Sequence, residues 1–446
     1  MLGSGAAGGP PAPESPAAMP LSVTSETGRL RSVLVHEPGR EIDRMTPTMM
    51  ERLLFDDILY GEEAREEHRL FRRLLESAGV EVLDAQNLLA EALEREGVQR
   101  ELLDELGREY GVGARVVERL AGLPPAELAG ALVGGLRSEG DDGRDGQRVP
   151  FDLVPVPNYF FQRDPQVVLG DRVVVSAMAT DAREREPLLA RTVFRHHPRL
   201  ADGCADLYEI DAPPQAAADP ARAYPYPTLE GGDVLVPSPE VILVGISERT
   251  NRGGVEALAD YLRREETTFR HLFLVELPPR RSYMHLDTVF TVIDEGLALA
   301  YEPVIEPRAA GHTPGSGYVY HVDLYARGVS FDVRASLRRA LAEVGLDFEI
   351  VPCGGRDPLD QDREQWTDGA NAFALAPGVI FLYRRNRATV DELARRGWRV
   401  LGEEAAAAGE PVLGRGPTVV TLQGNELSRA RGGPRCMTMP LERDAP

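Results

Sequence analysis

The sequence of 446 residues contains no lysine, because all 50 of its basic residues are arginine. Reactions that need a protein lysine are therefore excluded, among them Schiff-base catalysis, a pyridoxal phosphate anchor and a Walker A phosphate loop. A bias in genomic base composition is enough to explain the missing lysines, and the exclusion holds whatever the cause.

Cysteine is also scarce, and long apolar runs are absent. Cys204, Cys353 and Cys436 lie far apart and in no CxxC spacing, which predicts neither a disulfide framework nor a zinc ribbon. The reducing cytoplasm is the expected compartment. No apolar run approaches the roughly 18 residues of a membrane span. Residues 1–20 are rich in Ala, Gly, Pro and Ser, lack the pattern of a signal peptide, and are predicted to be a disordered tail.

The overall charge is strongly acidic, at -21. This balance argues against a general affinity for the phosphates of nucleic acids, and it is compatible with a cationic ligand. The hydrophobic fraction of 43% is ordinary for a globular protein. The chain is long enough for more than one domain or for one large closed domain.

One stretch of the chain, residues 85–147, has a helical character. Leu, Ala, Glu and Arg recur there at helical spacing, with breaks at 111–113 and 123–125, and the polar run 138–147 follows. Before it, residues 30–36 read as a strand, 62–77 as an amphipathic helix and 80–83 as a short strand. We therefore predict several packed helices between strand-forming segments.

The remainder is rich in strands and contains a weak repeat. Strand–turn–strand units begin at Asp164, Asp233, Asp287 and Asn371. Each has a polar residue just before its first strand, a position called here the strand mouth, and a Pro, Gly or Asp turn between its two strands. Helical segments such as 253–265 and 333–344 lie between them. Their irregular spacing does not fit a solenoid. It predicts a radial array of αβ units whose polar residues converge on one central site.

The loop 424–440 places Cys436 among glycines and arginines. Glycine allows backbone and side chains to crowd a small ligand, and arginine can hold carboxylates or favour a thiolate. This setting favours a nucleophile over a structural thiol, which would more usually lie in an apolar run. Cys353 is interpreted as a structural thiol and Cys204 as incidental.

Four polar clusters lie at the strand mouths and could together perform chemistry. Alone, an Asp before a strand is usually a turn residue, and one histidine is usually structural. Together they supply a thiol nucleophile, an imidazole acid/base and carboxylates that could grip a planar, cationic guanidinium. The clusters are Asn158 to Pro165 (NYFFQRDP), Glu230 to Asp233 (EGGD), Met284 to Thr288 (MHLDT) and the Cys436 loop.

A free thiol with a pKa of about 8.5 is mostly protonated at neutral pH, and a bound guanidinium beside it would favour the thiolate. A zinc site of His285, Asp287 and Cys436 is the alternative. We disfavour it because a metal-bound thiolate is a poorer nucleophile, and we predict no metal and no cofactor.

These motifs resemble those of the arginine deiminase family, within the guanidino-group-modifying (pentein) superfamily. The resemblance covers nearly the whole chain after the tail, with the motifs in the right order. It implies an α/β fold, a fivefold pseudosymmetric α/β propeller at 21–84 and 148–446, with an α-helical domain inserted at 85–147. The matching segments are 25–36 (SETGRLRSVLVH), 54–58 (LFDDI), PNYFFQRDP, EGGDVL, GISERT, MHLDTVFT and RGGPRCMTMP.

The resemblance also implies a role for each residue. Cys436 attacks the guanidinium carbon of L-arginine, giving a covalent thiouronium intermediate. His285 protonates the departing ammonia and then activates water, and Glu230 orients His285. Asp164 and Asp287 hold the guanidinium. The amino-acid end of the substrate is assigned to Asn158, Phe161, Arg183, Arg249 and Arg431, with Arg185 as an alternative to Arg183.

Some questions stay open at this point. Arg435 precedes the cysteine where some relatives place histidine, and Gln162 replaces a common threonine. An amidinotransferase, another guanidine hydrolase such as an agmatine deiminase, and an inactive arginine-binding sensor are the alternative functions. Arg249 and Arg431 argue for a substrate with a carboxylate and therefore against agmatine. The resemblance suggests a homo-oligomer, and no nucleic-acid or membrane partner is expected.

Overall fold

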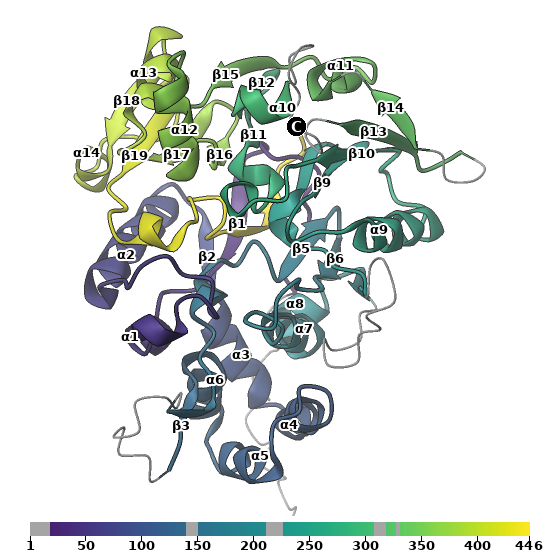
Figure 1. Cartoon of the computed structure of the whole chain (residues 1–446), viewed down its shortest axis with the longest axis vertical. Coiled ribbons are helices and arrows are strands. Elements are labelled where there is room, and N and C mark those ends of the chain that lie inside the picture. The colour runs from purple at the N-terminus through teal and green to yellow at the C-terminus, as the bar shows by residue number, and fades with distance from the viewer. Residues whose placement is uncertain (1–17, 140–149, 211–225, 307–317, 327–330, 335) are drawn as a thin grey trace, which may run out of the picture.

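The computed structural model describes residues 18–139, 150–210, 226–306, 318–326, 331–334 and 336–446 (Figure 1). Most of the predicted tail, residues 1–17, lies outside the described residues, as does the predicted polar run from 140 to 147. Met19 is buried, and its N–H donates a hydrogen bond to the carbonyl of Arg199. In the described part, no helix is both long and apolar enough to cross a membrane.

Five of the sheets in the described residues share one order of three strands. The first strand pairs antiparallel with a central strand, and the third pairs parallel with it. The first strands are β5 (Gln166–Leu169), β8 (Val234–Ser238), β11 (Phe290–Asp294), β16 (Phe373–Ala376) and β20 (Met439–Arg443). The central strands are β6 (Arg172–Val175), β9 (Val241–Ile246), β12 (Leu297–Ala300), β17 (Val379–Tyr383) and β1 (Leu30–Val35). The third strands are β7 (Asp206–Glu209), β10 (His271–Glu276), β15 (Glu349–Pro352), β19 (Thr418–Leu422) and β2 (Glu81–Asp84).

Helices connect each central strand to its parallel third strand, as such a crossover requires. They are α2 (Gly61–Ser77), α7 (Glu186–His196) with α8 (Pro198–Ala201), α9 (Arg252–Arg264), α10 (Glu302–Ile305) with α11 (Leu337–Ala342), and α13 (Arg387–Arg395) with α14 (Glu403–Ala407). The expected helix at 333–344 is shorter than predicted, because residues up to Arg334 belong to a strand that pairs with β13. Strands β13 (Val319–Asp323) and β14 (Asp332–Arg334) extend one sheet, and β18 (Arg399–Gly402) extends another.

One unit is assembled from both ends of the described chain. Its first strand, β20, pairs with β1, which places Met439 opposite Leu34 and Pro440 opposite Val33. The other four units correspond to the repeats seen in the sequence. The sheets of the described residues are not joined into a closed barrel, and the fold is mixed α/β.

Within the sequence block at 85–147, the described residues form helices α3 (Ala85–Leu93), α4 (Val98–Arg108), α5 (Ala114–Ala121) and α6 (Pro125–Gly134), at the lower end of Figure 1. A short two-stranded sheet, β3 (Leu136–Arg137) and β4 (Phe151–Leu153), follows. Helix α3 packs against α6 and α7. Leu89 of α3 and Val173 of β6 belong to one hydrophobic core, so these helices are continuous in packing with the strands.

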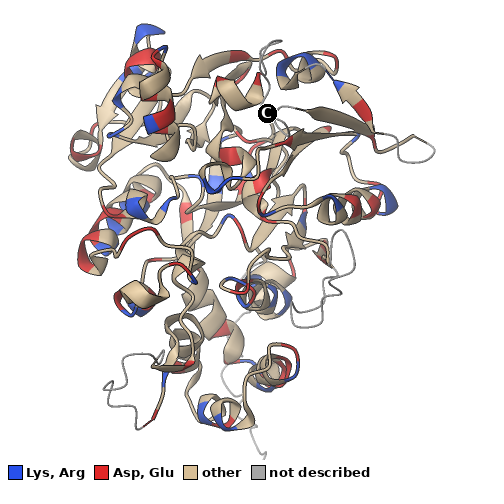
Figure 2. Cartoon of the chain, viewed as in Figure 1, with Lys and Arg blue, Asp and Glu red and all other residues tan. Residues whose placement is uncertain are grey.

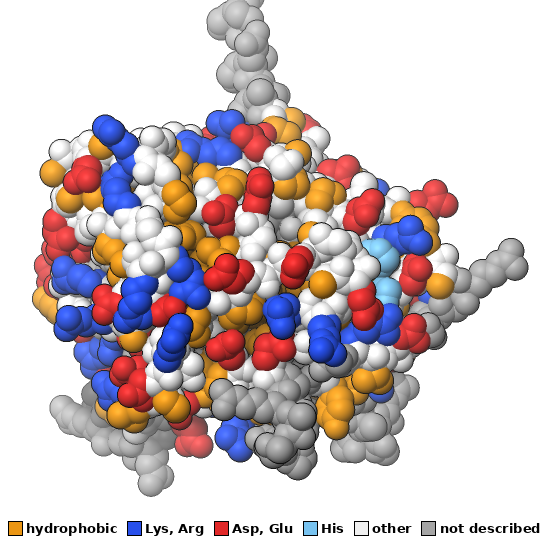
Figure 3. Space-filling model, turned by 90° about the horizontal axis from the view of Figure 1, so that it is seen from above, with side chains coloured by type: hydrophobic (Ala, Val, Ile, Leu, Met, Phe, Trp, Pro, Cys, Tyr) orange, Lys and Arg blue, Asp and Glu red, His pale blue; other side chains and the backbone are white. Residues whose placement is uncertain are grey.

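The remaining helical turns lie in connecting segments, several of them beside the strand mouths. They are α1 (Arg40–Asp43), α12 (Pro358–Trp366) and the 3-10 turns η1 (Pro47–Met49), η2 (Pro157–Phe160), η4 (Gly231–Asp233), η5 (Arg281–Tyr283), η6 (Leu286–Thr288) and η7 (Leu427–Ala430). Charged residues occur on the outer helices and also in the central loops (Figure 2). On the face seen in Figure 3, acidic and basic side chains are interspersed, and no broad basic patch covers that face.

Candidate active site

The predicted polar residues lie at equivalent places in the five units. Each precedes the first strand of its sheet: Asp164 before β5, Glu230 before β8, His285 and Asp287 before β11, Asn371 before β16, and Cys436 before β20. Hydrogen bonds and ion pairs connect these segments directly. The structure therefore brings together the five residues that were expected to be catalytic.

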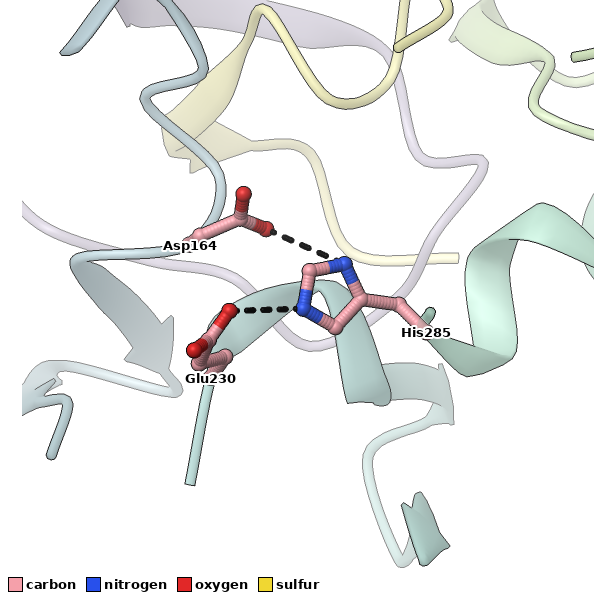
Figure 4. A group of neighbouring side chains, drawn as sticks. All are labelled: Asp164, Glu230 and His285. Carbon is pink, nitrogen blue, oxygen red and sulfur yellow. Dashed lines mark hydrogen bonds and ion pairs between the residues drawn. The ribbon is translucent and has the colours of Figure 1, made fainter. Parts of the chain in front are cut away.

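His285 lies between two carboxylates (Figure 4). Its Nε2 is 2.8 Å from Glu230 Oε2, and its Nδ1 is 3.6 Å from Asp164 Oδ1. Burial alone lowers the pKa of His285, but the charge of Asp164 and the hydrogen bond to Glu230 raise it to about 9. Burial opposes ionisation of Glu230, whereas Arg249 and His285 lower its pKa to about 2. The imidazole is therefore held as a cation beside an ionised glutamate at neutral pH.

Gly232, the second glycine of the EGGD motif, leaves room for His285. A Cβ atom at Gly232 would lie 2.6 Å from His285 Nδ1 and 2.8 Å from Asp164 Oδ1. Any larger residue would push the imidazole away from the carboxylate. The motif thus supplies both the partner of the histidine and the space in front of it.

Cys436 is buried, with its Sγ 3.8 Å from Asp287 Oδ2. Burial raises the pKa of this thiol well above its ordinary value, and the charges of Asp287, Asp164 and Asp368 raise it further. Burial likewise raises the pKa of Asp287, against the effect of Arg435. Without a cation beside it, the sulfur is a protonated thiol.

Arg435, whose role the sequence left open, is fully buried and saturated with partners. Its Nη1 donates to Asp287 Oδ2 at 2.8 Å, and its Nε and Nη2 donate to the two oxygens of Glu26 at 3.1 Å each. Burial raises the pKa of Glu26, but Arg435 and Arg163 lower it to about 2. Arg435 thus holds Asp287 in place through Oδ2, and Glu26 balances the charge of Arg435. Glu26 lies in the 25–36 motif, to which the sequence analysis assigned no role.

Of the two candidate arginines near residue 184, Arg183 faces the site. Its Nη1 donates to Asp164 Oδ2 at 2.5 Å, and its Nη2 donates to Glu186 Oε2 at 2.7 Å. Arg185 instead donates to the carbonyls of Leu132 and Val154, beside the helical block. Arg183 is therefore a charge partner of Asp164 in this structure.

The other residues assigned to the amino-acid end surround the same centre. Arg249 Nη1 is 3.9 Å from Glu230 Oε2. Asn158 is buried, and its Nδ2 donates to the carbonyl of Leu53 at 2.9 Å. Phe161 packs against the cysteine loop, because a Cβ at Gly432 would lie only 2.1 Å from its ring. Arg431 has a left-handed backbone with φ of 66°, and its guanidinium carbon is 3.4 Å from the centre of the Trp366 ring.

Several buried charged atoms here lack a hydrogen-bond partner among the residues that the structure describes. They are of both signs. On the acidic side they are Asp164 Oδ1, Asp287 Oδ1 and Asp368 Oδ2, and on the basic side Arg249 Nε, Arg431 Nε and Arg431 Nη1. Leaving buried charged groups without hydrogen bonds is costly, so a ligand that carries groups of both charges would be stabilised at this place.

Asp164, Glu230 and His285 could in principle bind a metal ion, since one ligand atom from each lies within 4.8 Å of the others. The carboxylates of this group already face cations. Arg183 lies against Asp164, and both Arg183 and Arg249 have a nitrogen 3.9 Å from Glu230. The donor set is thus charge-balanced by arginine, and the absence of a metal stays a prediction.

Comparison with known proteins agrees with these motifs. The family model for arginine deiminase matches residues 51–121 and 137–443. The chain belongs to the arginine deiminase family. An arginine deiminase from Listeria welshimeri is 35% identical over 438 residues, covering 95% of this chain and 98% of that protein. One from Clostridium perfringens is 36% identical over 442 residues, covering 95% and 98%.

A solved structure shares the fold at much lower identity. SxtG, an amidinotransferase from Microseira wollei, matches with a TM-score of 0.55 and 15% identity, over 96% of this chain and 98% of that one. This likeness supports the mixed α/β fold alone. The predicted family membership is confirmed by the sequence relatives.

In this arginine deiminase family member, sequence reasoning missed two buried residues at the mouth of the β16 unit. Asp368 has a left-handed backbone, with φ of 63°, and burial raises its pKa to about 7 against the charge of Arg431. Asn371 accepts hydrogen bonds from the backbone N–H groups of Arg435 and Cys436. Only their position in the sequence could have indicated a role for Asp368 and Asn371, because the repeat places them where the other units carry site residues.

Proposed function

We propose that the protein is an arginine deiminase that hydrolyses L-arginine to L-citrulline and ammonia. The observation that carries this proposal is the set of charged atoms without partners around a buried thiol. Among the described residues, Asp164 and Asp287 each keep a carboxylate oxygen that accepts no hydrogen bond and could accept from a guanidinium, and Arg249 and Arg431 keep N–H groups that could donate to a carboxylate. Arginine has both groups at opposite ends.

The first half of the reaction forms the covalent intermediate. A guanidinium beside Cys436 lowers the pKa of the thiol, because the thiolate pairs with the cation. The sulfur then forms a bond to the guanidinium carbon. Protonated His285 gives its proton to one nitrogen of the guanidinium, and the bond between that nitrogen and the carbon breaks. Ammonia departs, and a thiouronium remains attached to Cys436.

The second half releases the product. His285, now neutral, takes a proton from water while the water oxygen bonds to the thiouronium carbon. The carbon–sulfur bond then breaks while the second proton of the water is lost to solvent, which returns the thiolate and gives citrulline. Glu230, 2.8 Å from Nε2, stabilises the imidazolium in both halves.

We also propose the finer architecture that this function uses. The five strand units are taken to surround one axis as a fivefold α/β propeller, because the mouth of each contributes to one site. The catalytic domain would then comprise 21–84 and 148–446, with an α-helical domain inserted at 85–147. A homo-oligomer, a cytoplasmic location and a role in arginine catabolism remain predictions.

The test is to incubate the protein with L-arginine and to measure citrulline and ammonia. We expect equal amounts of both. Agmatine should react far more slowly, because it has no carboxylate for Arg249 and Arg431. Cys436→Ala should abolish turnover yet still bind arginine by calorimetry, because the carboxylates remain.

The same assay separates the alternatives. Citrulline-free transfer of the amidino group to an added amine would indicate an amidinotransferase, and faster turnover of agmatine would indicate an agmatine deiminase. Binding of arginine without any turnover would indicate a sensor. Each of these results would refute the deiminase proposal.

A further inference from the structure

Asn371 lies at the mouth of the β16 unit and is fully buried. Its Oδ1 accepts two hydrogen bonds, from the backbone N–H of Arg435 and of Cys436, each at 3.1 Å. Its Nδ2 donates to the backbone carbonyl of Asp287 at 3.2 Å. One neutral side chain therefore connects the loop of Cys436 to the loop of Asp287, whose Oδ2 is 3.8 Å from the sulfur.

The cysteine loop also packs directly on this side chain. A Cβ atom at Gly433 would lie 2.6 Å from Asn371 Oδ1 and 2.8 Å from Asn371 Cβ. Gly433 therefore allows the loop to approach closely enough for both backbone N–H groups to reach the same oxygen. The position of the cysteine loop therefore depends on the position of the Asn371 side chain, and the reverse.

The charge of residue 371 matters as much as its hydrogen bonds. Three carboxylates, Asp287, Asp164 and Asp368, already disfavour ionisation of Cys436. An aspartate of the same size could accept the same two hydrogen bonds. It would add a fourth negative charge beside the sulfur, and it could not donate to the carbonyl of Asp287.

We propose that Asn371 is a positioning residue, whose amide holds Cys436 in register with Asp287 without adding negative charge beside the sulfur. The proposal rests on the function proposed above, in which Cys436 is the nucleophile. Asn371 acts through backbone atoms of residues 435, 436 and 287, and it is not assigned any contact with the substrate.

The experiment compares Asn371→Asp and Asn371→Ser with the wild type. Alkylation of Cys436 by iodoacetamide, followed by mass spectrometry of its own peptide, reports the thiol in the free protein. For Asn371→Asp, we expect the pH midpoint of alkylation to rise by about one unit. We expect kcat to fall by about 10²-fold, with a much smaller change in KM, because Asp164 still faces the guanidinium.

Asn371→Ser separates position from charge. It keeps a shorter oxygen acceptor and adds no charge, so kcat should fall while the alkylation midpoint stays at the wild-type value. If Asn371→Asp does not fold, Asn371→Ser alone decides the question: a lowered kcat supports the proposal and a wild-type kcat overturns it.

Asn251→Asp is the matched control. Asn251 Oδ1 also accepts from two backbone N–H groups, those of Thr228 and Gly254, and its Nδ2 donates to the carbonyl of Tyr226. In Asn251→Asp, the pH midpoint for alkylation of Cys436 should equal that of the wild type. A shift as large as that of Asn371→Asp would overturn the proposal. Folded Asn371 variants with wild-type kcat and midpoint would also overturn it. Failure of the deiminase function itself would appear separately, as a wild type that makes no citrulline.

Discussion

Two buried histidines, in different regions of the molecule, each lie between two carboxylates. His285, at the strand mouths, is 2.8 Å from Glu230 and 3.6 Å from Asp164. His36, at the end of β1, is 3.3 Å from Glu41 and 3.8 Å from Asp84. Burial lowers both pKa values, but the neighbouring carboxylates raise them to about 9 for His285 and about 10 for His36.

The carboxylates of the two clusters differ in what else they bind. Asp84 accepts hydrogen bonds from the backbone N–H groups of Glu37, Gln86 and Asn87, and so caps helix α3. Glu41 accepts from the N–H of Gly39. At the strand mouths, Asp164 Oδ1 and Asp287 Oδ1 have no such partner among the described residues.

This difference shows that residue types and raised pKa values do not by themselves identify an active site. The His36 cluster has both, and its carboxylates are occupied in fastening β1 and β2 to the helical block. At the strand mouths, Asp164 and Asp287 each keep a buried oxygen that accepts no hydrogen bond from the described residues, and Asp287 lies beside Cys436. Free buried charges, beside a nucleophile, are what indicate a ligand.

The largest effect should come from exchanging the histidines one at a time. We expect His285→Asn to lower kcat by at least about 10³-fold, because the general acid and base is lost. We expect His36→Asn to leave kcat within a few-fold of the wild type. Steady-state assays of citrulline formation check both.

The comparison fails if the two variants lose activity equally. Thermal unfolding of each variant is the control, since a low kcat in a partly unfolded protein says nothing about chemistry. His285→Asn should keep a cooperative transition.

A second, smaller effect concerns stability and its pH dependence. The folded pKa of His36, about 10, lies above its ordinary value of 6.5, so the stability it contributes is complete below pH 6.5 and is lost as the pH rises through 10. We expect His36→Asn to lower the free energy of unfolding by about 3 kcal/mol at low pH, because two buried carboxylates lose their cation. Urea denaturation at several pH values measures this difference.

The difference between wild type and variant should shrink as the pH approaches 10. Using the difference removes the contribution of His285, which titrates in the same window in both proteins. A gap that stays constant with pH would mean that His36 is not a buried cation.

Much of the fold could be predicted because its signals are local. Apolar runs separated by Gly, Pro or Asp turns predicted the units that begin near Asp164, Asp233, Asp287 and Asn371. The unit of β1 and β20 was not predicted, because its strands lie at opposite ends of the chain and nothing local indicates their pairing. The helix expected at 333–344 was too long, since pairing with β13 decides the state of residues 332–334.

The candidate site shows the same division. The motifs predicted which of the charged residues would meet, and the structure brings Asp164, Glu230, His285 and Cys436 together. The sequence could not predict which of the buried charged side chains pair with one another. Arg435 pairs with Glu26, which lies 409 residues away in the chain. Asn371 was seen at a strand mouth, but a neutral side chain gives no chemical signal.

The smallest predicted effect extends the comparison to two arginines of one loop. All three donor groups of Arg435 are engaged, whereas Nε and Nη1 of Arg431 have no hydrogen-bond partner among the described residues, and this guanidinium lies over the Trp366 ring. We expect Trp366→Ala to raise the KM for arginine by about two- to fivefold with little change in kcat, because a cation–π contact contributes roughly 0.5–1 kcal/mol. Initial-rate kinetics over a range of arginine concentrations measure this effect.

Two comparisons make that small change interpretable. Trp366→Phe keeps an aromatic face and should stay within about twofold of the wild type, since a phenyl ring retains part of the cation–π attraction. With agmatine as substrate, the two variants should differ little, because there is no carboxylate for Arg431 to hold. If Trp366→Ala instead lowered kcat and left KM unchanged, the ring would support the cysteine loop, and Arg431 would belong with Arg435 among the structural arginines.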